Sequence, residues 1–224
     1  MNDNATRTGP VLATRELLGL PNRITLARTV VAMAFAVVAY RVGTPVWLFI
    51  AYPVYWLGDS LDGGVARYRK EETISGAVFD IVCDRACAFF LAGAFLAVYP
   101  DVLGPLALFL FQFGVLDTML SLAFLLWPGC ISPNYFYRID KPIWRFNWSM
   151  PAKALNTGGV VVSLVLGHAF GLMWLAYLTA SLLALLKIVS LTRLLRILTG
   201  HTPARPDSAP DDDLGDQIPG VQRP

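Results

Sequence analysis

The sequence is poor in charged residues and in the side chains that most often carry covalent or transition-metal chemistry. Of its 224 residues 15% are Asp, Glu, Lys or Arg, against about 25% in a typical soluble domain. Its three cysteines lack paired spacing, which excludes a disulfide framework, and we expect Cys83 and Cys87 to be packing residues rather than metal ligands. The two histidines, His168 and His201, fall near a turn and in a tail, so neither is placed for catalysis.

Apolar residues take the place of the missing charge. They make up 55% of the chain, and the mean hydropathy of +0.54 is typical of a polytopic membrane protein. The pattern predicts an all-α integral membrane protein, because several stretches approach the roughly 20 apolar residues that cross a bilayer. Six transmembrane helices are expected within a membrane domain of residues 21–199, at 24–40, 46–66, 75–98, 102–127, 154–169 and 171–198.

The two ends of the chain differ from this middle part. Residues 1–10 are polar and lack the apolar core and cleavage site of a secretory signal. We assign residues 1–20 to an N-terminal segment in which Val11 to Leu20 can form a juxtamembrane amphipathic helix, with a linker free of lipid as the alternative. Residues 200–224 are rich in Gly, Pro and Asp, which predicts a disordered cytosolic tail.

The basic residues predict the orientation in the membrane. With a cytoplasmic N-terminus, Arg41 is the one residue of the 18 Lys and Arg that falls in an outside loop. The inside loops then hold most of the others, as the positive-inside rule requires; these are Arg67, Arg69, Lys70, Arg138, Lys141, Arg145 and Lys153. We therefore expect both termini to face the cytoplasm of a bacterial plasma membrane. No nucleic-acid partner is expected.

Four aspartates stand at helical spacing inside this membrane-grade sequence. Asp59 and Asp62 share one helical stripe, and Asp80 and Asp84 share another, because residues three and four apart are neighbours on a helix. Counted from the middle of the polar turn at 68–75, Asp62 and Asp80 are each about eight or nine residues away, so they meet at similar depth. Ionised groups inside a membrane are costly, and their clustering indicates a functional site that faces the cytoplasm.

Four acids at one level repel one another unless cations join them. Mg²⁺ and Mn²⁺ prefer carboxylate oxygens and commonly act with substrate phosphates, so the cluster predicts a centre of two divalent ions for phosphoryl transfer. A structural network of the aspartates with Arg67 and Arg85 is the alternative, although buried ion pairs seldom add much net stability.

The stretch resembles the CDP-alcohol phosphotransferase (CDP-alcohol phosphatidyltransferase) family, whose pattern is Asp-x2-Asp-Gly-x2-Ala-Arg-x8-Gly-x3-Asp-x3-Asp. Every fixed position is present, as Asp59, Asp62, Gly63, Ala66, Arg67, Gly76, Asp80 and Asp84. Upstream, the stretch Pro21 to Arg28 looks like the one that many members carry just before and into their first membrane helix.

The resemblance implies a role for each of these residues and a homodimer. It makes Asp84 the general base for the acceptor hydroxyl and also a neighbour of one metal ion, with Asp59, Asp62 and Asp80 as metal ligands. It implies that the nucleotide contacts are Gly63, Ala66, Arg67, Asn22, Thr25 and Thr73. The implied reaction moves the phosphatidyl group of CDP-diacylglycerol onto an alcohol and releases CMP.

The acceptor is expected to be a phosphorylated polyol such as glycerol 3-phosphate or inositol phosphate. Lys153 lies about where phosphatidylglycerophosphate and phosphatidylinositol-phosphate synthases carry a lysine-rich stretch, and Arg138, Lys187 and Arg193 are further candidates. Lys187 pairing with Asp117, and a solvated loop for Arg138, remain open alternatives. In the fourth helix Leu116 precedes Asp117, where the glycerophosphate branch often has an arginine beside the acid.

Two other functions remain open from the sequence. One is transfer of a phospho-amino-alcohol from a CDP-alcohol to diacylglycerol, which would not need cations for an acceptor phosphate. The other is a divalent-cation transporter with the aspartates along the ion path. Against the transporter, the acids cluster at one depth and no charged ladder leads to the outside.

Overall fold

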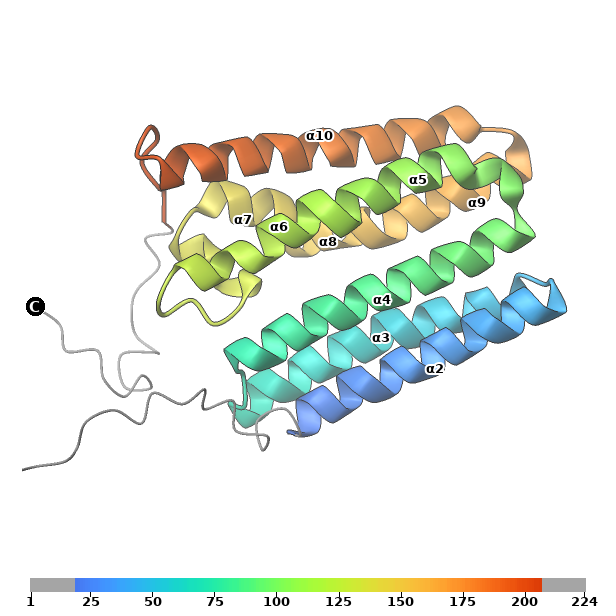
Figure 1. Ribbon diagram of the computed structural model, residues 1–224, viewed down its shortest axis with the longest axis horizontal. Coiled ribbons are helices and arrows are strands. Elements are labelled where there is room, and N and C mark those ends of the chain that lie inside the picture. Colours follow the sequence, from blue (N-terminus) through green and yellow to red (C-terminus); the bar gives the residue numbers. More distant parts are fainter. Residues whose placement is uncertain (1–18, 207–224) are drawn as a thin grey trace, which may run out of the picture.

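The computed structural model describes residues 19–206, and this part of the chain is helical with no β-strand, which confirms the all-α prediction (Figure 1). The helices, including short 3-10 and π segments written η, are α2 (Leu20–Val42), α3 (Val46–Arg69), α4 (Ile74–Val98), η1 (Pro100–Val102), α5 (Leu103–Phe111), η2 (Gln112–Asp117), α6 (Thr118–Leu122), η3 (Ala123–Leu126), η4 (Pro133–Arg138), α7 (Lys141–Asn147), α8 (Met150–Ala154), η5 (Leu155–Gly159), α9 (Val160–Phe170) and α10 (Met173–Leu198).

Five helical stretches of the described chain are long and apolar enough to cross a membrane, as expected of an integral membrane protein. They are Leu20–Val42, Ile74–Val98, Pro100–Leu126, Lys141–Phe170 and Met173–Leu198. The predicted span at 46–66 corresponds to α3, which has 24 residues and carries Asp59 and Asp62 and is not among these five stretches, so the count of six is not confirmed. The predicted juxtamembrane helix falls on residues that lie almost wholly outside the described part.

The helices form two groups that run side by side (Figure 1). One group is α2, α3 and α4; the other holds α5 with α6, α7 to α9, and α10. Small residues bring α2 against its neighbours, since Ala32, Ala36, Ala39 and Ala51 are 0 to 1% exposed.

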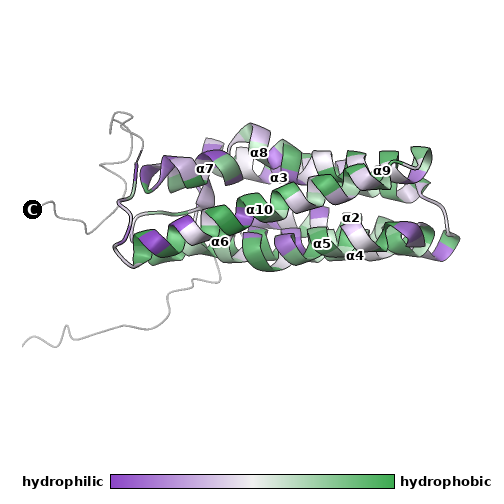
Figure 2. Cartoon of the chain, turned by 90° about the horizontal axis from the view of Figure 1, so that it is seen from above, coloured by the Kyte–Doolittle hydropathy of each residue, from purple (hydrophilic) through white to green (hydrophobic). Residues whose placement is uncertain are grey.

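The α3–α4 turn and the loop before α7, both predicted to be inside, lie at one end of the molecule (Figure 1). This end, here called the basic end, holds the α3–α4 turn, the segment from η4 to α7, and the C-terminal end of α10. Figure 2 shows hydrophilic residues along α7 at this end, whereas hydrophobic residues are frequent along the long helices away from it. Residues 141–153 were predicted to be loop as well, but they are largely helical and belong to the stretch Lys141–Phe170 that is long enough to span a membrane.

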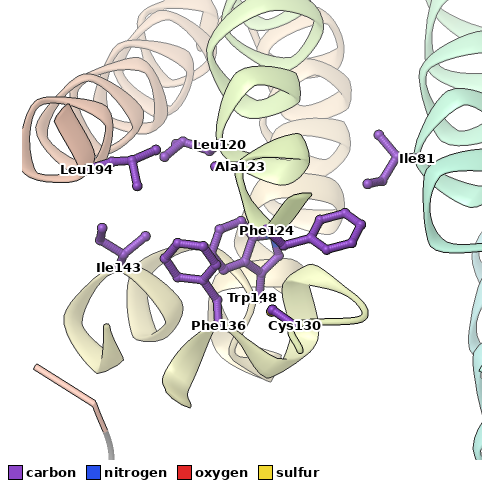
Figure 3. Packing of buried hydrophobic residues seen from close by; sticks show 9 residues of the cluster. All are labelled: Ile81, Leu120, Ala123, Phe124, Cys130, Phe136, Ile143, Trp148 and Leu194. Carbon is purple, nitrogen blue, oxygen red and sulfur yellow. The ribbon is translucent and has the colours of Figure 1, made fainter. Parts of the chain in front are cut away.

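Aromatic side chains pack around the segment from η3 to α7 at the basic end (Figure 3). Phe124 and Phe136 are 0% exposed, and the Phe136 ring lies 5.1 Å from that of Trp148. Ile143 of α7 and Leu194 of α10 close the cluster from the other side. The loop from η3 to α7 is therefore part of a packed core.

A buried ion pair holds α7 against α10. Asp140 is 0% exposed and caps α7, accepting the Ile143 amide N–H at 2.9 Å. Arg193 donates to both Asp140 oxygens, from Nε at 3.0 Å and from Nη2 at 2.7 Å. Burial alone would raise the pKa of Asp140, but the hydrogen bonds from Arg193 and the backbone outweigh burial and hold that pKa below its ordinary value.

The beginning of the predicted tail joins this ion pair. The Arg205 amide N–H donates to Asp140 Oδ2 at 3.1 Å, and the Lys141 amide N–H donates to the Arg205 carbonyl at 2.8 Å. Residues 207–224 lie outside the described residues, so the predicted disorder there stays a prediction.

We expect Asp140→Asn to lower the thermal unfolding midpoint in detergent, because it leaves the half-buried Arg193 guanidinium beside a neutral group. Removing one partner of a fully buried pair costs about 3 kcal/mol, and the loss here should be smaller because the Arg193 side chain is 24% exposed. A carboxylate with a lowered pKa contributes stability at all pH values above its ordinary pKa of about 3.9, and loses that contribution as the pH falls through the folded-state value. The difference in unfolding midpoint between wild type and variant should thus be large at neutral pH and small below about pH 4.

Asp101→Asn is the matched control. Asp101 pairs with His168 at 2.9 Å, but its side chain is 48% exposed, so this pair should contribute little. Equal losses of thermal stability in the two variants would contradict the role assigned to Asp140.

Candidate active site

The candidate site lies where α3 and α4 form an antiparallel hairpin. Lys70 ends α3 with a left-handed φ of 55°, and Thr73 caps α4 by accepting the Gly76 amide N–H at 3.0 Å. Asp62 stands seven residues before the end of α3 and Asp80 six residues after the start of α4. At about 1.5 Å per residue, the two carboxylates are at the same depth below the basic end.

The carboxylates converge as the spacing predicts. Asp59, Asp62 and Asp80 each offer an oxygen atom, and these atoms all lie within 4.8 Å of one another. Asp62 is buried, whereas the side chains of Asp59 and Asp80 are 36% and 37% exposed, so the cluster has a buried floor and an accessible rim.

One arginine of α2 joins all four aspartates. The Arg28 side chain is 3% exposed, and its Nε donates to Asp62 Oδ2 at 2.9 Å. Its Nη2 donates to the other three acids, at 2.5 Å to Asp80, 2.9 Å to Asp84 and 3.3 Å to Asp59. Arg28 belongs to the stretch Pro21 to Arg28 that resembles the family, but no role was predicted for it. The sequence did contain a sign of this role. Arg28 is a cation in an apolar helix, and it follows Thr25 by three residues and Asn22 by six.

Neighbouring residues fix the position of Arg28. A Cβ added at Gly58 would lie 2.6 Å from Arg28 Cβ, so the glycine makes room for the arginine stem. The Tyr55 ring lies 5.3 Å from the guanidinium, within the range of a cation–π contact. Thr25, predicted to contact nucleotide, donates its hydroxyl to Asp62 at 2.6 Å and so also orients this carboxylate.

The other predicted nucleotide residues lie between the aspartates and the basic end. On α3, Gly63 and Ala66 are half-buried and Arg67 is exposed; a Cβ added at Gly63 would lie 3.3 Å from Arg67 Nη1. A Cβ at Gly76 would lie 2.9 Å from Thr73 Oγ1 and 3.0 Å from Asn22 Oδ1. The structure therefore brings Asn22, Thr73 and Gly76 together, with only small groups beside the α4 backbone.

A second charged network starts from Arg85, the residue after Asp84. Arg85 donates to Asp117 Oδ2 at 2.5 Å, and Lys187 lies 2.5 Å from the other oxygen of the same carboxylate. Lys187 is 2% exposed and also donates to Asn147 Oδ1 at 2.9 Å. Of the alternatives stated for Lys187, the pairing with Asp117 is present in the structure.

The remaining acceptor candidates do not converge with Lys187 on one point. Arg193 is held by Asp140, as described above, and the exposed Lys153 donates to Asn134 Oδ1 at 2.7 Å. The Arg138 guanidinium lies 5.3 Å and 5.7 Å from the ring centroids of Tyr135 and Tyr137. Their role in acceptor binding stays a prediction.

A tyrosine that the sequence analysis did not single out links the two helix groups at the basic end. Tyr135 in η4 donates its hydroxyl to Glu72 Oε2 at 2.6 Å, next to the Thr73 cap. Burial, followed by the Glu72 carboxylate, raises the pKa of Tyr135 to about 12, so the hydroxyl keeps its proton at neutral pH.

An apolar cavity of about 210 Å³ lies between α3, α4, α5 and α9. Tyr55 and Phe113 line it, and their rings contact Arg28 and Arg85, the latter at 3.7 Å. The cavity therefore reaches both charged networks.

Two π-helical turns face each other across the second helix group. Gln112 of η2 donates to Asn156 of η5 at 3.3 Å, and both side chains are buried. Such turns are frequent at functional sites.

The aspartate cluster has the chemistry of a divalent-cation site. Four carboxylates face one guanidinium, which leaves an excess of negative charge, and Arg28 Nη2 already marks a position that three carboxylates share. Oxygen ligands of this kind suit Mg²⁺ or Mn²⁺.

Comparisons with known proteins agree with the motif. The sequence profile of the CDP-alcohol phosphatidyltransferase family matches residues 18–186. A phosphatidylinositol phosphate synthase from Mycolicibacterium smegmatis is 37% identical over 65 residues, and this match spans 29% of the present chain and 29% of the relative. No solved structure is significantly similar to the chain. Since the profile covers more than half of the sequence, the resemblance is confirmed, and the chain belongs to the CDP-alcohol phosphatidyltransferase family.

Proposed function

We propose that this protein transfers the phosphatidyl group of CDP-diacylglycerol to an alcohol and releases CMP. The convergence of Asp59, Asp62, Asp80 and Asp84 on one cation position carries this proposal. The family supports phosphatidyl transfer over cation transport, because its name describes a transferase. The basic end faces the cytoplasm of a bacterial membrane in this account, and the protein acts as a homodimer.

Asp59, Asp62 and Asp80 would hold two Mg²⁺ or Mn²⁺ ions, with Asp84 beside one of them. When bound, the ions neutralise the diphosphate and polarise its phosphoryl oxygens. The protein's own part is to fix the ligands: Thr25 and Arg28 each donate to Asp62, so this buried carboxylate has one orientation.

Asp84 acts as the general base. Its side chain is 21% exposed, so the carboxylate is accessible to an acceptor hydroxyl. The proton of the acceptor hydroxyl passes to Asp84 as the acceptor oxygen bonds to the phosphorus that carries diacylglycerol. The bond from that phosphorus to the CMP oxygen breaks, and CMP leaves with the electron pair.

Nucleotide and lipid parts bind on opposite sides of the carboxylates. At the basic end, the small surfaces of Gly63 and Gly76 admit the nucleotide against the helix backbone, and Arg67 offers a planar fork to phosphate. On the other side, the apolar cavity next to Tyr55 takes part of an acyl chain.

A phosphorylated polyol is the acceptor in this account. The matched relative is named a phosphatidylinositol phosphate synthase, and its reaction is carried over here only as part of the proposal. Arg85 and Lys187 share the single carboxylate of Asp117, so positive charge remains in excess beside Asp84. An acceptor phosphate would bind there, with Arg138, Lys153 and Arg193 as further candidate ligands.

The direct test is CMP release by the purified protein from CDP-diacylglycerol with Mg²⁺ or Mn²⁺. The acceptors to compare are glycerol 3-phosphate, inositol 1-phosphate, serine and phosphatidylglycerol. We expect a phosphorylated polyol to give the fastest release and EDTA to stop it. Release with CDP-ethanolamine and diacylglycerol, and none with CDP-diacylglycerol, would contradict the proposal.

Asp84→Asn should lower the rate of CMP release at least about a hundredfold, because an amide cannot take the proton of the hydroxyl. Binding of CDP-diacylglycerol should persist, since Asp84 is not a nucleotide contact. Equal rates in variant and wild type would rule out Asp84 as the base.

Asp59→Asn should raise the Mg²⁺ concentration that gives half-maximal activity and also lower the maximal rate, because it removes one proposed ligand. Asp101→Asn, the same change at an exposed position in the loop after α4, serves as the control and should alter neither quantity. An unchanged Mg²⁺ dependence in Asp59→Asn would remove this residue from the ligand set.

Ala88→Phe should fill part of the apolar cavity and raise KM for long-chain CDP-diacylglycerol about tenfold, which corresponds to about two methylene groups left unburied. A short-chain CDP-lipid should be affected much less. Val162→Phe on α9 is the matched control, because Val162 is 56% exposed and does not line the cavity. Equal effects on the two chain lengths would show that acyl chains bind elsewhere.

A further inference from the structure

We propose that Arg28 is the built-in countercharge of the aspartate site, and that its Nη2 competes with a divalent ion for the oxygens of Asp59, Asp80 and Asp84. In the metal-free protein the guanidinium holds the four acids together. A divalent ion must displace Nη2 from the shared position before it can bind there. The inference rests on the proposed function in one respect, namely that these acids bind divalent ions.

The hydrogen bonding of Arg28 is unlike that of an arginine built to recognise a carboxylate. In such a pair two nitrogens donate side by side to the two oxygens of one acid. Here Nη2, which has two hydrogens, lies within 3.3 Å of oxygens from three different acids. Nη1 is buried and has no hydrogen-bond partner among residues 19–206. One nitrogen therefore takes the place of a small cation among several ligands.

The position of Arg28 is set by the surrounding helices as well as by its charge. Gly58 has no side chain, which leaves room for the aliphatic part of Arg28. Tyr55 lies against the guanidinium, and the Arg28 side chain is 3% exposed. Nη2 cannot leave the carboxylates without a change of rotamer in a confined space. The free-energy cost of displacing Nη2 therefore weakens the binding of a divalent ion.

The charges predict how removal of Arg28 changes both the stability of the metal-free protein and its affinity for a divalent ion. Without Arg28 the four aspartates would face one another with no cation of α2 between them, so the metal-free protein should be less stable. The same change removes a positive charge and a competing donor from the ion position, so a divalent ion should bind more tightly. A merely structural arginine would produce the first effect without the second.

The experiment compares wild type with Arg28→Gln, which has a neutral amide, and with Arg28→Lys, which keeps the charge. Mn²⁺ binding is titrated by electron paramagnetic resonance without substrate, and thermal unfolding is followed with EDTA and with Mn²⁺. We expect Arg28→Gln to bind Mn²⁺ about tenfold more tightly and to show a lower midpoint in EDTA and a larger rise on adding Mn²⁺. Arg28→Lys should stay closer to wild type in Mn²⁺ affinity.

A second pair of variants keeps the inference testable if Arg28→Gln does not fold. Gly58→Ala leaves the charge but pushes on the Arg28 stem, so it should also tighten Mn²⁺ binding, by a smaller factor. Gly93→Ala on α4 is its control, because a Cβ there meets nothing within 4 Å.

The outcomes separate the inference from the proposed function. Equal Mn²⁺ affinity in wild type, Arg28→Gln and Gly58→Ala would overturn the competition and leave the transfer reaction standing. Absence of Mn²⁺ binding in all of them would overturn the inference together with the proposed metal site.

Discussion

The structure depends on one constraint, which is that a charge buried among membrane helices must be neutralised by a partner from another helix. Arg28 is a partner of this kind for four aspartates at once, although it offsets only part of their charge, and these aspartates lie on both other helices of its group. Gly58 and the buried alanines of α2 allow the close approach that these bonds need. The arrangement of α2, α3 and α4 is therefore inseparable from the chemistry of the site.

The same constraint organises the second helix group. Asp117 pairs with both Arg85 of α4 and Lys187 of α10, and Asp140 pairs with Arg193. Arg85 follows Asp84 directly in α4, so the Asp117 network connects the α3–α4 hairpin to the helices that would bind the acceptor. In the proposed reaction, the base and the acceptor phosphate are thus positioned by adjacent residues of one helix.

The sequence was sufficient to predict an all-helical membrane protein and the aspartate cluster, but not the number of spans, because hydropathy and a spacing of three or four residues report on helix faces and less directly on where each helix begins. The convergence of Asp59, Asp62 and Asp80 follows from counting residues on either side of one turn. The role of Arg28 did not follow in the same way, since its partners are 31 to 56 residues away and depend on how α2 packs. Arg193 shows the same limit: its bidentate partner Asp140 lies in a loop whose path hydropathy does not describe.

In our proposal the four aspartates form a divalent-cation site around the position of Arg28 Nη2. Anomalous diffraction from crystals soaked in Mn²⁺ tests this. We expect anomalous peaks within coordination distance of Asp59, Asp62 and Asp80, with the Arg28 guanidinium moved from its place among the acids. Ordered aspartates with Arg28 still between them, and Mn²⁺ peaks only elsewhere on the protein, would contradict it.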